Sequence, residues 1–458
     1  MLTKKILFIW FLWASLLTFW YAQNSGLPLG YDHGAYKHLV NLLAENNDLG
    51  ALPTYLQYQF EPFSGTFFYS ITTWTGKEIL FGWWYLCFFI LTSVGLFLLW
   101  KKKKKYTLGS YLGLFLFLFS SIQYMNLWWA FGKQMFATFF LILLMRYCKK
   151  GFIAFLFITA CISLHRLTGF VALSYFAISY FVSQKKSIKQ YYSVLIGIGA
   201  GFLSYIALFH EQVFPHIKNF ITSPEKQILI DGKYGTGFSG GELFFYLVPI
   251  LLMVILWSVT LISQKSTKNL LRLPAVAFAL LLGVFVVFRF IAHTRLWTFL
   301  DLFLIIIITR YLYTFFHRKW IYIFLIIQCI VWWTFVSKWH TPFVDQTEYR
   351  IIQDITHDMP ENISLVTLSW AYMSWITGYT NREIYSPRQW IWQEIWSSLE
   401  RKSMKNNPQV LCSNLSKLSW NVILYIWARE QYTSLTNNTC IKEVKGWENG
   451  TKLFLYQR

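Results

Sequence analysis

Charged side chains are scarce in this chain. Only 21 of its 458 residues are Asp or Glu, and charged residues of both signs make up 14% of the sequence. A soluble domain carries about 25% charged residues. Hydrophobic residues reach 55% and aromatic residues 21%, and apolar runs of roughly 17 to 22 residues recur, which is long enough to cross a bilayer as helices. The composition therefore predicts an α-helical polytopic membrane protein.

Several catalytic signatures are also missing. The sequence has no nucleotide-binding loop, no zinc-type cysteine spacing and no serine-nucleophile elbow, which weakens the case for ATP-driven transport and for a hydrolase. Four of the six cysteines lie in or beside apolar runs and are predicted to act as small apolar residues. Cys412 and Cys440 share a polar region, where a disulfide and two free thiols both remain open.

The apolar runs predict about eleven membrane spans, near residues 5–22, 79–100, 107–123, 134–147, 151–164, 168–183, 191–209, 243–262, 273–291, 296–313 and 320–337. The basic clusters fall in alternate connections, so the excess of 41 basic over 21 acidic residues indicates topology and not nucleic-acid binding. This pattern predicts a protein of the cytoplasmic membrane with a cytoplasmic N-terminus. The first span is predicted to be an uncleaved signal anchor.

The prediction divides the chain into two domains. Residues 1–339 form the transmembrane domain, with a catalytic first outer loop at 23–78 in which 61–75 is an amphipathic helix on the membrane. Residues 340–458 form a small soluble exterior α/β domain. In that domain we expect strands at 363–369 and 421–427, a helix at 390–404, and a hairpin at 440–457 that turns at 448–450.

Polar groups at the outer face are the candidate site. The loop segment Gly30–Tyr36 carries a lone acid, Asp32. Cations recur after alternate spans and are therefore expected on the same face; the candidates for binding an anionic headgroup are Lys133, His165, Arg166, Arg289, His293 and Arg295. The candidate acceptor or loop residues are His33, Tyr36, His38, Glu61 and Arg382.

A carboxylate facing several cations at a membrane surface suits transfer of a sugar from a lipid phosphate. The leaving phosphate needs positive charge, which arginine supplies with planar donors that stay charged. The acceptor hydroxyl needs a base, which an outward-facing acid can provide.

The chain resembles the GT-C superfamily of polytopic glycosyltransferases, which use polyprenyl-phosphate-linked sugars as donors. The resemblance is carried by the early acid in GYDHGAY, by the segment beginning Glu61-Pro62-Phe63, and by residues 129–134 (WAFGKQ), 163–169 (SLHRLTG) and 375–382 (WITGYTNR) followed by Tyr385-Ser386-Pro387. It implies a lipid-linked donor, an inverting transfer to a glycan, lipid or protein acceptor, and Asp32 as the catalytic base or the group that orients the acceptor.

The chain departs from that pattern at one point. Members of the family often carry paired acids, whereas His33 follows Asp32 here. Later loops offer only scattered candidates for further carboxylates, such as Glu211, Asp231 and Glu242. The sequence therefore indicates no certain cofactor and does not favour a bound divalent metal.

Each candidate also has a structural interpretation. Asp32 could cap a helix at 34–43, the arginines and Lys133 could be interfacial anchors, and the histidines could be structural. Asp301 lies inside a predicted span, where Arg295 or Arg310 could be its partner.

Two further functions remain open as alternatives. A polymerase of the O-antigen or exopolysaccharide type also joins lipid-linked sugars but does not need the exterior domain. A transporter would need polar residues through mid-membrane and related repeats, and the sequence shows no clear repeat.

Overall fold

The computed structural model describes part of the chain. The described residues are 8, 10–17, 32–46, 63, 67, 70, 78–100, 108–128, 131–148, 150–182, 192–204, 206–207, 274–287, 293–309, 318–339, 344–359, 363–367, 370–380, 384–385, 404, 406–418, 422–426, 435 and 438–456. The connection 210–242 and the predicted span 243–262 that follows it lie outside them, as do nearly all of the predicted helices at 61–75 and 390–404.

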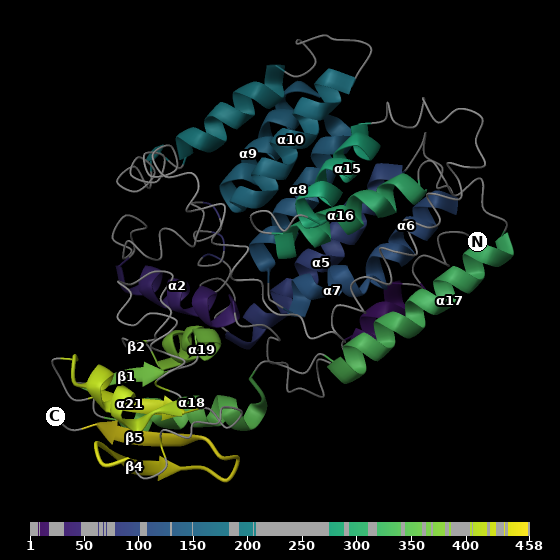
Figure 1. Ribbon diagram of the computed structural model, residues 1–458. Coiled ribbons are helices and arrows are strands. Elements are labelled where there is room, and N and C mark those ends of the chain that lie inside the picture. The colour runs from purple at the N-terminus through teal and green to yellow at the C-terminus, as the bar shows by residue number, and fades with distance from the viewer. Residues whose placement is uncertain are drawn as a thin grey trace. The chain divides into compact units, whose positions relative to one another are not determined.

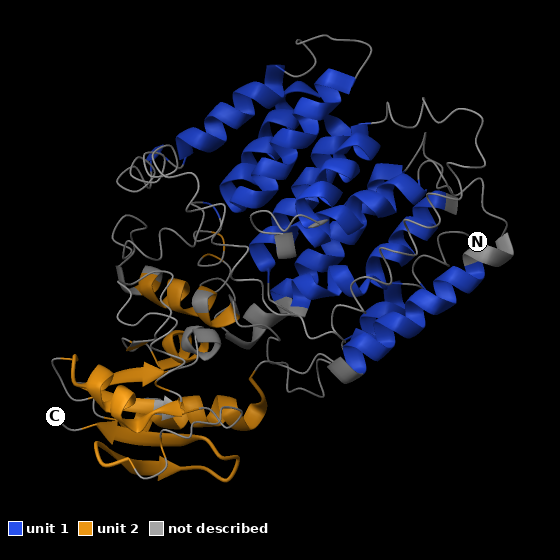
Figure 2. Cartoon of the chain, viewed as in Figure 1, with its two compact units in different colours: residues 1–26, 61–64, 79–341 blue, residues 27–60, 65–78, 342–458 orange. Residues whose placement is uncertain are grey.

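The chain divides into two compact units, which Figure 2 distinguishes by colour. Unit 1 comprises residues 1–26, 61–64 and 79–341, and unit 2 comprises residues 27–60, 65–78 and 342–458. Most of the predicted first outer loop, 23–78, is therefore grouped with the C-terminal residues.

Unit 1 is helical (Figure 1). Its helices include α5 (Glu78–Trp100, whose first residue is grouped with unit 2), α6 (Leu108–Leu118), α7 (Ser121–Trp128), α8 (Gly132–Tyr147), α9 (Gly151–Leu164), α10 (Arg166–Val182), α15 (Pro274–Val287), α16 (His293–Ile307), α17 (Arg318–Thr334) and the short π-helix η3 (Phe335–Trp339). Residues 10–17 and 192–204 are helical as well. Neighbours in sequence also pack together, as α8 does with α9, α9 with α10, and α15 with α16.

Small residues allow close approach between two of these helices. The helical residues 192–204 pack on α9, where a Cβ atom added at Gly197 would lie 2.3 Å from Cγ2 of Ile158. A Cβ atom at Gly201 would lie 2.9 Å from Ile162. Glycine at both positions therefore lets the backbones lie closer than alanine would allow.

The predicted spans and the observed helices agree in type but differ in detail. Where the structure describes a predicted span, its residues are helical, although the run 107–123 is broken into α6 and α7 around Ser120. Residues 124–128, predicted to belong to an outer loop, are the end of α7. No helix in the described part of the chain is both long enough and apolar enough to cross a membrane.

Unit 2 contains a mixed sheet with the strand order β2-β1-β3-β5-β4. The strands are β1 (Ser364–Thr367), β2 (Ile384–Tyr385), β3 (Val422–Ile426), β4 (Ile441–Gly446) and β5 (Lys452–Tyr456). Strand β1 runs parallel to β2 and β3, and β5 runs antiparallel to β3 and β4. The predicted strands at 363–369 and 421–427 and the predicted hairpin are confirmed. Gly450, in the hairpin turn, has a φ angle of 90°, which glycine adopts without strain.

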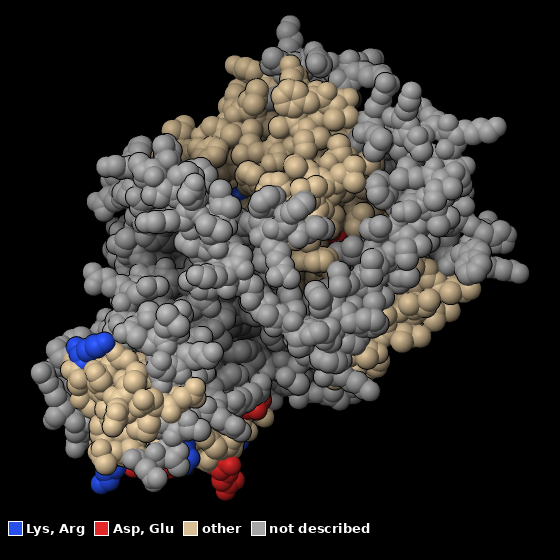
Figure 3. All heavy atoms as spheres, viewed as in Figure 1, with Lys and Arg blue, Asp and Glu red and all other residues tan. Residues whose placement is uncertain are grey.

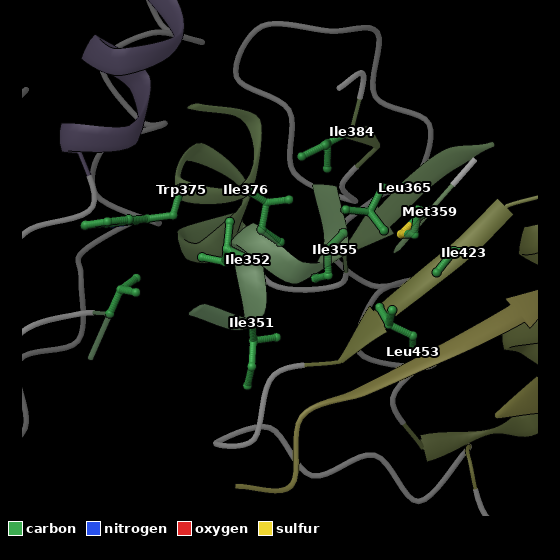
Figure 4. Close-up of a cluster of buried hydrophobic side chains, with 11 residues drawn as sticks. Ile351, Ile352, Ile355, Met359, Leu365, Trp375, Ile376, Ile384, Ile423 and Leu453 are labelled. Atoms are coloured by element: carbon green, nitrogen blue, oxygen red, sulfur yellow. The ribbon is translucent and has the colours of Figure 1, made fainter. Parts of the chain in front are cut away.

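Four helices accompany this sheet in the described residues of unit 2: α2 (Asp32–Asn46), α18 (Gln346–Asp358), α19 (Trp370–Thr380) and α21 (Pro408–Leu415). Helix α18 begins with a capping box, because the Asp345 side chain accepts from the Glu348 amide while the Glu348 side chain accepts from the Asp345 amide. Figure 4 shows the core that α18 and α19 form with the sheet. Its buried members include Ile352, Trp375 and Leu365, each 0% exposed.

A disulfide joins Cys412 in α21 to Cys440 beside β4, with the Cα atoms 5.9 Å apart. Of the two alternatives left open by the sequence, the structure has the bridge. It closes a loop whose ends are 28 residues apart in sequence.

The two units differ in their described surfaces. In the view of Figure 3, charged side chains gather on unit 2, whereas the described atoms of unit 1 are nearly all uncharged. This difference matches the change in composition near residue 340.

Candidate functional site

A polar network lies inside the apolar helices of unit 1, beginning at the break between α6 and α7. Ser120 accepts a hydrogen bond from the backbone amide of Gln123 at 3.1 Å, as a residue preceding a helix commonly does. Its hydroxyl also donates to Oδ2 of Asp301 in α16 at 2.9 Å. The break therefore supplies both the start of α7 and a donor for a buried acid.

Asp301 is fully buried, and neutral groups bind one of its oxygens. Oδ2 accepts from Ser120 and, at 2.9 Å, from Nε2 of Gln123, while Oδ1 has no hydrogen-bond partner among the described residues. Of the two arginines predicted as partners, Arg310 lies outside the described residues. The observed donors to Asp301 are these uncharged side chains and not Arg295.

The network continues from Gln123 to the second turn of α16. Nε2 of Gln123 donates to the backbone oxygen of Thr298 at 2.7 Å, and Nε2 of Gln134 donates to Oγ1 of Thr298 at 2.8 Å. Thr298 in turn donates to the backbone oxygen of Arg295 at 2.7 Å. A cavity of about 10 Å³ adjoins these groups, with Asn126 and Thr298 in its wall. Its volume matches the lower limit for one water molecule.

Arg295 lies next to His165, which is 2% exposed between α9 and α10. Nη1 of Arg295 is 3.3 Å from Nε2 of His165, and the guanidinium carbon lies 4.4 Å from the ring centroid of Phe131. On the other side of the His165 ring, Nδ1 lies 2.8 Å from Oγ1 of Thr168 and 3.3 Å from the Thr168 backbone nitrogen, which donates to it. The His165 ring therefore lies between the Arg295 guanidinium and the first turn of α10.

The other predicted headgroup-binding residues fall in different places in unit 1. Lys133 is buried near the start of α8, whereas Arg166 is exposed as the first residue of α10. His293 is the first residue of α16, and Arg289 lies outside the described residues. The structure thus brings His165 and Arg295 into contact.

The predicted loop acid belongs to unit 2. Asp32 is the first residue of α2, which begins two residues earlier and ends three later than the helix predicted at 34–43. His33, Tyr36 and His38 are buried at 2%, 2% and 9% exposure. They therefore help to pack α2, and their predicted role in acceptor binding stays a prediction, as do those of Glu61 and Arg382, which lie outside the described residues.

Helix α2 packs on α19 through an aromatic group. Nε2 of His33 is 2.7 Å from the hydroxyl of Tyr379, and the His33 ring lies 5.3 Å from that of Trp375. Burial, followed by the nearby Lys37 ammonium, lowers the pKa of His33 to about 3. His33 is consequently neutral at ordinary pH.

Sequence reasoning missed most of the buried network in unit 1. Ser120, Gln123, Asn126 and Thr298 were not singled out, although amide side chains three residues apart in an apolar run are a usable signal. Among the described residues, no group of His, Cys, Asp and Glu could hold a metal ion. The acids considered for that purpose, Glu211, Asp231 and Glu242, lie outside those residues.

The structure is similar to that of ArnT from Cupriavidus metallidurans in the apo state, with a TM-score of 0.63 and 10% sequence identity over 99% of this chain and 98% of that one. The two chains therefore share a fold. The chain belongs to the EpsG family, whose sequence model matches residues 8–351.

A second solved structure, the Archaeoglobus fulgidus oligosaccharyltransferase in the apo form, is similar over 88% of this chain and 66% of that one, with 12% identity and a TM-score of 0.48. No sequence among curated proteins matches the chain.

Proposed function

We propose that this EpsG-family chain is a membrane glycosyltransferase that moves a sugar from a polyprenyl-phosphate-linked donor to an acceptor at the outer face of the cytoplasmic membrane. The observation that carries the proposal is the GT-C fold, shared with ArnT over nearly the whole chain. The acceptor is a glycan, a lipid or a protein, and the N-terminus is cytoplasmic while unit 2 is exterior.

Exposed apolar faces in unit 1 support a membrane location. Phe152 on α9 and Phe181 on α10 are each 72% exposed, and Tyr322 and Ile330 on α17 are 65% and 60% exposed. Soluble proteins rarely expose contiguous apolar patches of this kind, and acyl chains would cover them. The disulfide of unit 2 also suits an oxidising exterior compartment.

Arg295 and His165 are the strongest candidates for the donor phosphate. A guanidinium among apolar helices presents a permanent positive charge where water competes little, so it stabilises a leaving phosphate more than it would in bulk solvent. His165 lies against the guanidinium, with its Nε2 3.3 Å from Nη1 of Arg295. Arg166, Arg289, His293 and Lys133 are proposed as further contacts to the lipid phosphate.

Asp32 is proposed as the catalytic base. The acceptor hydroxyl oxygen forms a bond to the anomeric carbon as the bond from that carbon to the phosphate oxygen breaks. The hydroxyl proton moves to the Asp32 carboxylate, and the lipid phosphate leaves with the bonding electron pair. Attack from the face opposite the phosphate inverts the anomeric configuration.

The test uses the purified full-length chain in lipid nanodiscs. Radiolabelled polyprenyl monophosphate and diphosphate sugars are supplied with glycan, lipid and protein acceptors, and the products are separated by size. Asp32→Asn is expected to lower kcat at least 10²-fold, the usual range for a general base. Arg295→Ala is expected to raise KM for the donor and to lower kcat/KM about 10²- to 10³-fold.

Matched controls are available on α18, where Arg350 and Asp354 are both exposed. Arg350→Ala and Asp354→Asn change the same chemical groups away from the candidate residues and are expected to keep full activity. Wild-type activity in Asp32→Asn would remove the assigned base. Failure to transfer from every donor by well-folded protein would refute the proposed function, and a ladder of products would identify a polymerase instead.

A further inference from the structure

We propose that α19 positions the first turn of α2, with Gly378, Tyr379 and Asn41 acting as positioning residues for Asp32. The inference rests on the proposed function, since it takes Asp32 as the base. It adds a requirement that the assignment of Asp32 alone does not contain: a backbone contact about 340 residues further along the chain must be intact for proton transfer to occur.

The contact between Gly378 and Gly34 leaves no space for a side chain. A Cβ atom added at Gly378 would lie 2.2 Å from the backbone oxygen of Gly34, 2.9 Å from its carbonyl carbon and 3.0 Å from its Cα. These are backbone atoms and cannot rotate away. Any residue other than glycine at 378 must therefore shift α2 relative to α19, and Gly34 is only two residues from Asp32.

The side chain of His33 provides a second contact in the same turn. Its Nε2 lies 2.7 Å from the Tyr379 hydroxyl. Tyr379 stacks on Trp375 with ring centroids 5.4 Å apart and an interplanar angle of 13°, and Trp375 is fully buried in the core of unit 2. The partner of His33 is thus fixed by the packed interior of the domain.

A third contact lies two turns further along α2. Nδ2 of Asn41 donates to the backbone oxygen of Gly378 at 3.2 Å, and Oδ1 of Asn41 accepts from Lys37 at 3.0 Å. Helix α19 ends at Thr380, so the Gly378 carbonyl is one of the last four, which have no partner within a helix. Residues 34 and 41 are separated by about 10 Å along a helix. Contacts at both points fix the direction of α2 as well as its position.

Proton transfer depends steeply on this geometry. A base must be within about 3 Å of the proton that it removes, and a misplacement of about 1 Å can cost 10²-fold in rate. Donor binding depends on different residues in the proposed function. We therefore expect Gly378→Ala to lower kcat about 10²-fold while KM for the donor stays unchanged.

The experiment compares Gly378→Ala with Gly283→Ala in the full-length chain. Gly283 lies in α15, and a Cβ atom there would meet nothing within 4 Å, so the same substitution is expected to leave kcat unchanged. Hydrogen exchange at the amides of α2 provides a readout that does not require activity. Faster exchange is expected in Gly378→Ala than in the wild type.

A second variant covers the case in which Gly378→Ala does not fold. Tyr379→Phe combined with Asn41→Ala removes the two hydrogen-bonding groups without adding volume, and it is expected to lower kcat at least 10-fold with KM for the donor unchanged. Wild-type kcat in this double variant would overturn the positioning role, as would equal kcat in folded Gly378→Ala and Gly283→Ala.

The two proposals fail in different ways. If Asp32→Asn is inactive but Gly378→Ala and the double variant are fully active, the assignment of Asp32 as the base is supported and the positioning role of α19 is wrong. If Asp32→Asn is fully active, the base is wrong and the positioning role falls with it.

Discussion

Acidification should loosen α2 from α19, because His33 is buried in its neutral form. The His33 ring is 2% exposed between the two helices, and its pKa is lowered to about 3 by burial and then by Lys37. In an open state, in which α2 has separated from α19, the His33 ring is hydrated and its pKa returns to about 6.5. Since the open state binds the proton more readily, the stability that neutral His33 contributes is present above about pH 6.5 and is lost as the pH falls toward 3.

The size of the effect follows from these two pKa values. Between pH 7 and pH 5, the open state gains about 25-fold in population relative to the closed state, which corresponds to about 2 kcal/mol. Most of this change falls below pH 6.5, where the ring of the open state becomes protonated. Protonation stabilises the closed state very little between pH 7 and pH 5, because the pKa of His33 in that state is about 3, two units below pH 5.

Hydrogen exchange followed by mass spectrometry measures the opening directly. The full-length chain in nanodiscs is labelled at pH 7 and at pH 5, and the rates for peptides from α2 are corrected for the intrinsic dependence of exchange on pH. We expect the corrected opening constant of α2 to rise about 25-fold, while peptides from α9, which contains no ionisable group apart from buried Cys161, serve as the internal reference.

His33→Gln is the matched variant, since glutamine keeps a polar group for the Tyr379 hydroxyl but does not titrate in this range. Its α2 peptides should show no such rise. An equal rise in His33→Gln and in the wild type, or no rise in either, would show that His33 does not carry the pH dependence.

Two further predictions concern stability. Replacing Cys412 and Cys440 by serine should lower the free energy of unfolding of unit 2 by about 3.5 kcal/mol, because the bridge closes a loop whose ends are 28 residues apart. Chemical denaturation followed at peptides from β4 and β5 tests this, and an unchanged denaturation midpoint would contradict it. Asp301→Leu should destabilise unit 1 by about 3 kcal/mol, because the Ser120 and Gln123 donors lose their acceptor. Asp301→Asn keeps an acceptor oxygen and should therefore unfold at a higher temperature than Asp301→Leu. Equal melting temperatures for the two variants would contradict the role of Asp301 as the acceptor.

The sequence predicted local structure well where periodicity and turn chemistry decide it. The strands at 364–367 and 422–426 and the hairpin turning before Gly450 were read from short apolar runs and a turn signal. The helical character of the apolar runs followed from their length. The break at Ser120 was missed, because two adjacent serines, Ser120 and Ser121, do not by themselves show that a new helix starts within an apolar run.

Contacts between distant residues were beyond the sequence. The residues around Asp32 and those at 375–382 were both noted, yet nothing in a pattern of neighbours connects His33 with Tyr379, 346 residues away. Likewise, the cost of burying Asp301 could be recognised from its position in an apolar run. Its actual donors could not, because neutral partners such as Gln123 satisfy a carboxylate without leaving a charge pattern in the sequence.

The placement of α2 in unit 2 has a consequence for synthesis of the chain on the ribosome. Helix α2 is translated before α19, and Tyr379 follows His33 by 346 residues. At about 5–20 residues per second, α19 is made roughly 20–70 s later. Throughout that interval the side chains that α2 buries against α19 lack their partner. In any chain that terminates before residue 370, the side chains that α2 buries against α19 stay without their partner permanently. Such truncated chains would be natural substrates for chaperones and quality-control proteases.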